Sequence, residues 1–183
     1  MSWTRPKSSW DLFLKMLSPT KGDRILDVGA GKGQVARQIM AASEGLEVFA
    51  LEPDEKRVAT MKRESPQLKS YAGASEKMPF EDSFFDKAYT TMALHHFTNL
   101  NAALLESARV LKNGGLLLIL DVEPSRGSGR LLRFFENTIL RNHLEFLGLE
   151  EIGQRIVATG RFEISGSSRG PFGYIVLCTK KAP

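Results

Sequence analysis

The chain has 183 residues, of which 42% are hydrophobic and 25% charged, as is usual for a soluble globular domain with a substantial core. No apolar run is long enough to span a membrane, and the first residues lack the apolar segment of a signal peptide, so we expect one cytoplasmic domain over residues 1–183. The net charge of +4 is modest and spread out, which disfavours a nucleic-acid partner, and the single cysteine, Cys178, excludes an intramolecular disulfide and a cysteine-based metal site.

The first 33 residues predict a helix, a strand and a glycine loop. Residues 8–18 carry apolar side chains at helical spacing, within an N-terminal segment 1–21. Residues 24–28 form an apolar run typical of a buried parallel strand. Gly29, Gly31 and Gly33 follow it, and helical spacing then resumes. Glycines let a ligand approach the backbone, and the unpaired amides of the next helix favour an anionic group.

The spacing of this loop excludes two common phosphate-binding motifs. A dinucleotide fingerprint needs a glycine where Gln34 stands, and a Walker A loop needs Ser or Thr where Gly33 stands. Asp27, just before the loop, would repel a pyrophosphate. It suits a ligand that carries both an ammonium and a carboxylate group.

At these residues the chain resembles the class I S-adenosylmethionine-dependent methyltransferases, in the branch of the ubiquinone and menaquinone biosynthesis enzymes, over about residues 22–122. The resemblance implies an α/β fold: a Rossmann-like, doubly wound sheet of seven strands, mostly parallel with an antiparallel C-terminal strand. It implies S-adenosylmethionine as cofactor. The residues that we expect to bind it are Asp27, Gly29, Ala30, Gly31, Gly33, Glu52, Pro53, Ser75, Glu76, Thr90, Thr91 and Met92. It also allows Trp10 or Phe13 to line the substrate pocket, although packing on the sheet is favoured for both.

Residues at the ends of the second and third predicted strands are expected to bind the nucleoside part of the cofactor. Glu52 ends the strand at 47–51, where a carboxylate can accept both ribose hydroxyls, and Pro53 can lie against adenine. The alternative is that Glu52 caps the next helix, a role that Asp54 fills better. A shorter strand at 68–72 leads to the family's adenine segment, where Ala74 replaces the usual acid, so amides of Ser75 and Glu76, or the Glu76 carboxylate, would recognise the base.

The fourth predicted strand, at 84–90, leads to residues expected at the methionine end of the cofactor. Thr90, Thr91 and Met92 lie at its carboxyl end, where ligands of parallel sheets bind. One imidazole of His95 and His96 could act as a general base or orient the substrate. A packed, hydrogen-bonded histidine is the favoured alternative, so no catalytic residue is assigned.

Beyond residue 98 the sequence predicts a helix at 99–111, a glycine C-cap within 112–115 and a fifth strand at 116–122. Glu123 is a candidate substrate-facing carboxylate, and residues 123–155 are the expected substrate-side segment. A helix at 129–146 would carry Arg126, Arg130, Arg133 and Arg141, which could bind an anionic substrate or RNA; a solvated face is favoured. Strands at 161–164 and 174–178 would form an antiparallel pair.

Together with these features, the resemblance implies a methyltransferase with a small-molecule acceptor. The Asn/Asp-Pro-Pro-aromatic tetrapeptide of amide and adenine N-methylation is absent after the fourth strand. A cofactor-binding regulatory or partner protein without turnover, and a methyltransferase acting on RNA or protein, remain alternatives. Asp27 and Gln34 disfavour a nucleotide-dependent oxidoreductase. The oligomeric state and the methyl acceptor stay open.

Overall fold

A computed structural model describes residues 9–124, 145–170 and 173–182. The strands are β1 (Arg24–Val28), β2 (Glu47–Glu52), β3 (Lys69–Ala72), β4 (Phe85–Thr91), β5 (Leu111–Val122), β6 (Phe162–Arg169) and β7 (Gly173–Lys180). The helices are α1 (Ser9–Leu17), α2 (Gln34–Ala42), α3 (Glu55–Glu64), α4 (Leu100–Val110) and α6 (Leu149–Ala158), with a 3-10 turn η1 (Leu94–His96).

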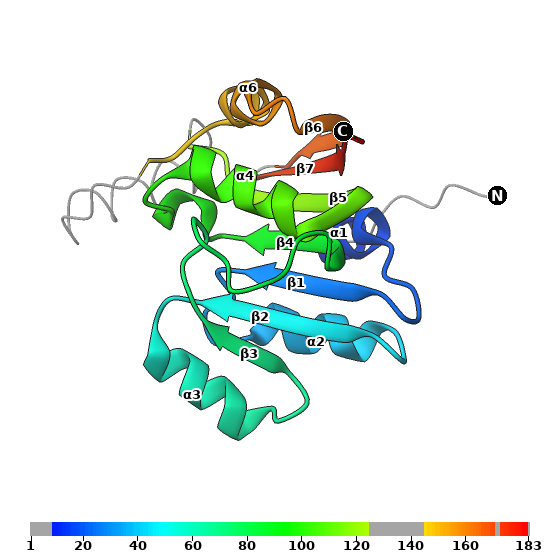
Figure 1. The fold of residues 1–183 in the computed structure, drawn as a ribbon. Coiled ribbons are helices and arrows are strands. Elements are labelled where there is room, and N and C mark those ends of the chain that lie inside the picture. The colour runs from blue at the N-terminus through cyan, green and yellow to red at the C-terminus, as the bar shows by residue number, and fades with distance from the viewer. Residues whose placement is uncertain (1–8, 125–144, 171–172, 183) are drawn as a thin grey trace.

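The seven strands form one sheet in the order β3-β2-β1-β4-β5-β7-β6 (Figure 1). Strands β1 to β5 pair in parallel, and β7 runs antiparallel to both of its neighbours, β5 and β6. The predicted α/β sheet, mostly parallel with an antiparallel C-terminal strand, is therefore confirmed.

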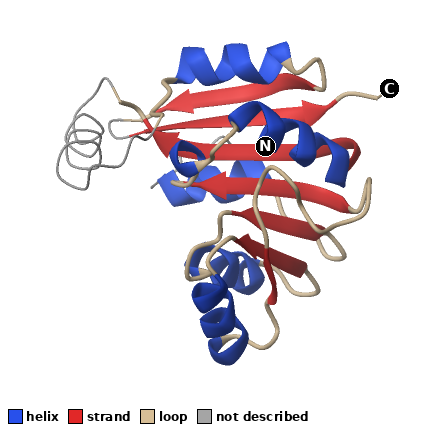
Figure 2. Cartoon of the chain, turned by 60° about the vertical axis from the view of Figure 1, so that its left-hand side comes forward, coloured by secondary structure: helices blue, strands red, loops and turns tan. Residues whose placement is uncertain are grey.

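Helices cover both faces of this sheet (Figure 2). Successive side chains of a strand point to opposite faces, and the buried residues of the central strands divide in this way. Leu26 and Phe49 belong to a core shared with α4 and α6, whereas Ile25 and Ala50 belong to a core shared with α1, α2 and α3. Strands buried on both sides need to be mainly apolar, as β1 and β2 are except for Asp27 and the polar residues at their ends.

The strand order reverses between β1 and β4. The chain runs outward from β1 through β2 to β3 and then crosses back to β4 on the other side of β1. Loops that leave β1 and β4 therefore diverge at the carboxyl ends of these strands, which is where open α/β sheets form ligand crevices.

The prediction of a glycine C-cap after the fourth helix is wrong. Helix α4 ends at Val110, and Leu111 already pairs with Phe85 as the first residue of β5. Residues 112–115 form a bulge, because the pairing resumes only at Leu116 opposite Lys87. Gly114, with φ of +75°, lets the strand make this excursion rather than ending the helix.

The arginines at 126, 130, 133 and 141, and nearly all of the helix predicted at 129–146, lie outside the described residues. Within the part of the chain that is described, no helix combines the length and apolar character needed to cross a bilayer.

Candidate functional site

A cavity of about 720 Å³ opens at the carboxyl ends of β1, β2, β3 and β4, at the point where the strand order reverses. Its volume lies within the usual range for pockets that bind small organic ligands. The lining comprises Trp10 and Phe13, residues 29–32, Gln34, Val35, residues 51–53, Arg57, residues 73–76, 91–93 and 96–98, and Leu120.

The glycine loop is tied to the end of β2 and packs closely against the turn after β4. The backbone N–H groups of Gly29 and Ala30 both donate to the carbonyl of Leu51, at 2.9 and 3.0 Å. Gly29 has φ of +79°, and a Cβ added there would lie 2.7 Å from the Cβ of Ala93. A glycine is thus required at this position by both conformation and space.

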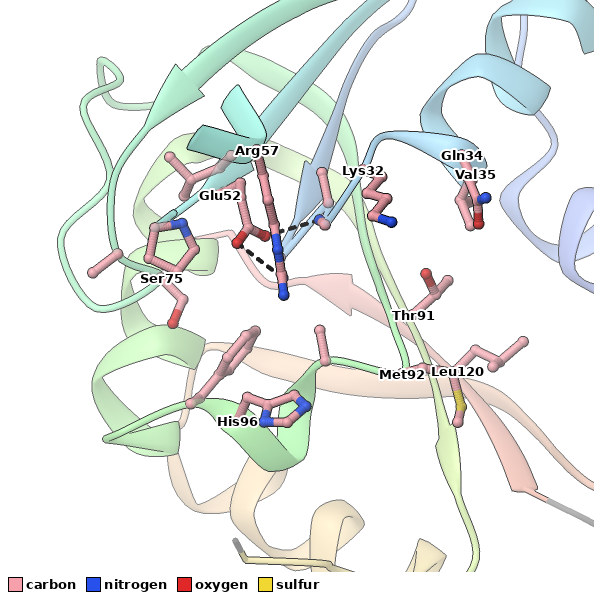
Figure 3. A pocket seen from close by; sticks show the side chains of 18 of the residues that line it. Lys32, Gln34, Val35, Glu52, Arg57, Ser75, Thr91, Met92, His96 and Leu120 are labelled. Atoms are coloured by element: carbon pink, nitrogen blue, oxygen red, sulfur yellow. Dashed lines mark hydrogen bonds and ion pairs between the residues drawn. The ribbon is translucent and has the colours of Figure 1, made fainter. Parts of the chain in front are cut away.

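Glu52 lies at the polar end of the cavity, and its side chain is only 5% exposed (Figure 3). Its Oε2 accepts a hydrogen bond from Gly31 N–H at 2.8 Å, and its Oε1 accepts from Asp54 N–H and Arg57 Nη1, both at 3.3 Å. Asp54 is the N-cap of α3, because its Oδ1 accepts from the amides of Lys56 and Arg57. The cap role expected of Asp54 is confirmed, and the Glu52 carboxylate faces the cavity.

Asp27 is buried next to the site but does not line the cavity. Neither carboxyl oxygen has a hydrogen bond of normal geometry within the described structure, although the Tyr89 hydroxyl lies close enough to interact with this carboxyl group. Burial raises the pKa of Asp27 from 3.8 to about 7; the Tyr89 hydroxyl partly opposes this shift, and the charge of Glu52 adds a smaller increase. Two other predicted residues also lie outside the lining: Gly33, the N-cap of α2, and Thr90, whose buried Oγ1 has no partner in the described structure.

The segment after β3 closes the polar end. Ser75 and Glu76 line the cavity together with Ala74 and Pro53. The Glu76 carboxylate accepts hydrogen bonds from Asn99 N–H and from Ser75 Oγ, both at 3.0 Å. Burial alone would raise the pKa of Glu76, but these two hydrogen bonds, together with the backbone amides of Glu76 and Thr98, outweigh it and lower the pKa.

The other end of the cavity is apolar and is formed by α1, the end of β4 and β5. Trp10 stacks on Phe13 with ring centroids 5.2 Å apart, and Phe13 packs edge-on against Tyr89. The α1 aromatics therefore both pack on the sheet and line the cavity. Met92 has φ of +52°, unusual for a residue with a side chain, and is 44% exposed at the cavity.

The two neighbouring histidines differ in their surroundings. His95 is buried, its Nδ1 lies 2.9 Å from Asp121 Oδ1, and its ring stacks on Phe146. His96 lines the cavity and is labelled in Figure 3. Of the two candidates, only His96 is placed to contact a ligand there.

Glu123 does not line the cavity. It is buried and forms an ion pair with Arg169 of β6, whose Nε lies 3.1 Å from Glu123 Oε2. Arg169 also pairs with Glu150 of α6, so this cluster joins β5, β6 and α6. Across residues 9–124, 145–170 and 173–182, no three His, Cys, Asp or Glu side chains are grouped so that they could hold a metal ion.

The sequence did not predict all of the lining residues, and those that it did not assign include Lys32, Gln34, Val35, Arg57 and Leu120. Lys32, Gln34 and Val35 lie next to Gly31 or Gly33 or close to them in the sequence. This position was a signal from which their contact with the cavity could have been predicted. Arg57 and Leu120 reach the cavity only through the packing of α3 and β5 and had no such signal.

Residues 26–119, just over half of the chain, match a protein family described as "Methyltransferase domain". A demethylmenaquinone methyltransferase of Tropheryma whipplei (strain Twist) is 30% identical over 112 residues, which are 61% of this chain and 47% of that protein. The sterol 4-C-methyltransferase strm-1 of Caenorhabditis elegans is 36% identical over 101 residues, which are 53% of this chain and 30% of that protein. The chain thus spans about half the length, or less, of these two relatives.

The fold is also shared with solved structures. An S-adenosylmethionine-dependent methyltransferase from Mesorhizobium loti superposes with a TM-score of 0.79 at 18% identity, covering 93% of this chain and 97% of that one.

Proposed function

Because the chain belongs to the methyltransferase domain family, we propose that it transfers the methyl group of S-adenosylmethionine to a small organic molecule. The observation that carries this proposal is a single cavity with a buried carboxylate, Glu52, and the glycine loop at one end and aromatic and thioether side chains at the other. The names of the two curated relatives, which act on demethylmenaquinone and on a sterol, support a small-molecule acceptor.

The residues at the polar end fit the chemistry of the nucleoside. The Glu52 carboxylate would accept the ribose hydroxyls, and Pro53, Ser75 and Glu76 would surround the adenine. This set is unchanged from the sequence prediction, apart from the Glu76 carboxylate, which is already engaged by Asn99 and Ser75. Recognition of the base is therefore left to backbone groups of this segment.

The glycine loop and the end of β4 fit the amino-acid part of the cofactor. Gly29, Ala30 and Gly31 line the cavity, as do Thr91 at the end of β4 and Met92 directly after it. Asp27 lies buried two residues before the loop, and neither of its oxygens has a well-aligned donor among the described residues. An ammonium group, held directly or through a water molecule, would supply that donor. Gly33 and Thr90 would support these residues from outside the cavity.

When bound, the cofactor supplies a methyl group that its positive sulfur already activates. The chain has to orient the acceptor and exclude water, and such positioning contributes roughly 7–11 kcal/mol in favourable cases. Trp10, Phe13, Met92 and Leu120 would hold the acceptor at the apolar end. His96 is the imidazole placed to take a proton from an acceptor hydroxyl or amine as the acceptor is methylated.

Incubation with methyl-labelled S-adenosylmethionine and a metabolite extract tests the proposed function. We expect label in a small organic product. Label on RNA or protein would overturn the acceptor class, and binding without turnover on any fraction would favour a regulatory or partner protein.

The variant Glu52→Gln tests the site. It keeps the shape of the side chain but removes the charge, so we expect S-adenosylhomocysteine to bind at least about tenfold more weakly, since hydrogen bonds to a charged acceptor contribute about 1.5–3 kcal/mol. Isothermal titration calorimetry measures this, with the exposed Glu44→Gln as the matched control. Equal affinity in Glu52→Gln and the wild type would contradict the assignment.

A further inference from the structure

We propose that Arg57 occupies a hydrogen-bonding position on the Glu52 carboxylate that the ribose needs, so that Arg57 leaves Glu52 when the nucleoside binds. The pairing seen in the structure then lowers the affinity for the cofactor. The inference rests on the proposed function, in which Glu52 receives both ribose hydroxyls.

The hydrogen-bonding capacity of Glu52 is nearly used up. An ionised carboxylate offers about four acceptor positions. Among the described residues three donors already point at this one: Gly31 N–H on Oε2, and Asp54 N–H and Arg57 Nη1 on Oε1. A ribose brings two hydroxyl donors, so about one donor has to leave before both can bind.

Of the three donors, Arg57 is the one that can leave. The amide of Gly31 belongs to the loop that Gly29 and Ala30 tie to Leu51, and the amide of Asp54 belongs to the N-cap of α3. Both are backbone groups held by other hydrogen bonds. The Arg57 side chain is 53% exposed and reaches Glu52 from the first turn of α3 (Figure 3).

Arg57 also pairs with a second carboxylate, that of Asp54, and can keep this contact when it leaves Glu52. Its Nε lies 3.6 Å from Asp54 Oδ2, while the other oxygen of Asp54 caps the helix. The guanidinium can thus turn from Glu52 into solvent and keep its attraction to Asp54. An ion pair with an exposed partner is weak, so giving it up lowers the affinity by about fivefold at most.

The experiment titrates 5′-methylthioadenosine, an uncharged nucleoside with both ribose hydroxyls, into the protein by calorimetry. We expect Arg57→Met to bind it about two to five times more tightly than the wild type. Arg57→Lys, which can still pair with Glu52, should stay close to the wild type. Arg63→Met, at the exposed end of the same helix where Arg63 contacts Glu64, is the matched control and should change nothing.

Two further measurements separate this role from a general change in the pocket. Raising the salt concentration from about 20 mM to about 300 mM screens the Arg57–Glu52 pair, so it should tighten binding in the wild type but not in Arg57→Met. The 3′-deoxy analogue of the same nucleoside brings one hydroxyl and needs one acceptor position. The gain from Arg57→Met should therefore disappear with it.

Weaker binding of the nucleoside by Arg57→Met would overturn the inference, because Arg57 would then contact the ligand. Unchanged binding would overturn it as well. Arg57→Gln serves as a second variant if the methionine impairs folding, which circular dichroism checks. Failure of Glu52→Gln to weaken binding would instead reject the proposed cofactor site, so the two failures are distinguishable.

Discussion

At the scale of single residues, the two acids that end neighbouring strands differ in how their oxygens are satisfied. Glu52 receives donors on both oxygens, two of them backbone amides. Asp27 has no hydrogen bond of normal geometry in the described structure; it is completely covered by protein, and the Tyr89 hydroxyl of β4 is its neighbouring polar group. A carboxyl group in that position is stabilised by a proton or by a cationic ligand, whereas Glu52 is suited to neutral hydroxyls.

The raised pKa of Asp27 predicts a pH dependence of stability. Between about pH 4 and pH 7 the folded state keeps a proton on Asp27 that the unfolded state has released. The free energy of unfolding therefore falls as the pH rises through this range, by about 1.4 kcal/mol per pH unit, and is level above it. Asp27→Asn should remove this slope. The free energy of unfolding of the variant, relative to that of the wild type, should therefore increase from about pH 4 to about pH 7. Urea unfolding at several pH values measures it, and a constant difference between pH 4 and pH 7 would contradict the assignment.

At the scale of elements, the glycine loop and the turn after β4 depend on each other. Gly29→Ala would bring a Cβ within 2.7 Å of the Ala93 Cβ while keeping φ of +79°. Gly160→Ala is a suitable control, since Gly160 also has a positive φ but nothing within 4 Å of the added Cβ. We expect Gly160→Ala to lose about 1 kcal/mol of stability and Gly29→Ala clearly more, because only the latter adds a clash. Equal losses in urea unfolding would contradict the close approach.

Arg109 of α4 fixes the segment that follows the adenine end of the cavity. Its guanidinium donates to the carbonyls of Met78 and Phe80 and to Glu106. Arg109→Leu would leave these acceptors without their donor, so we expect a loss of about 1–3 kcal/mol in the free energy of unfolding. Hydrogen exchange should also become faster in residues 76–82. Protection equal to that of the wild type in this segment would show that other contacts hold it.

The elements that sequence predicted well have local signals. Strand β1, the glycine loop and the Asp54 cap can each be recognised from a few consecutive residues, and Glu52 can be predicted from its place at the end of β2. The bulge at 112–115 was mistaken for a helix end because glycines serve both purposes. The partners of Arg57, His95 and Glu123 could not be predicted, since Glu52, Asp121 and Arg169 meet them only through tertiary packing or the geometry of a helix start.

At the scale of the whole molecule, the position of the cavity follows from the topology. Helices pack on both faces of the sheet, so each face is closed and the carboxyl ends of the strands stay accessible (Figures 1 and 2). The reversal between β1 and β4 separates the loops there. Residues from α1 to β5 therefore reach one cavity although they are far apart in the chain.

The most direct test is a titration of the ¹⁵N-labelled chain with S-adenosylhomocysteine, followed by the backbone amide signals. We expect saturable changes at Gly29, Gly31, Ser75 and Met92, from four separate parts of the lining. Changes confined to β6 and β7, or no change at concentrations that saturate a known methyltransferase, would contradict the account.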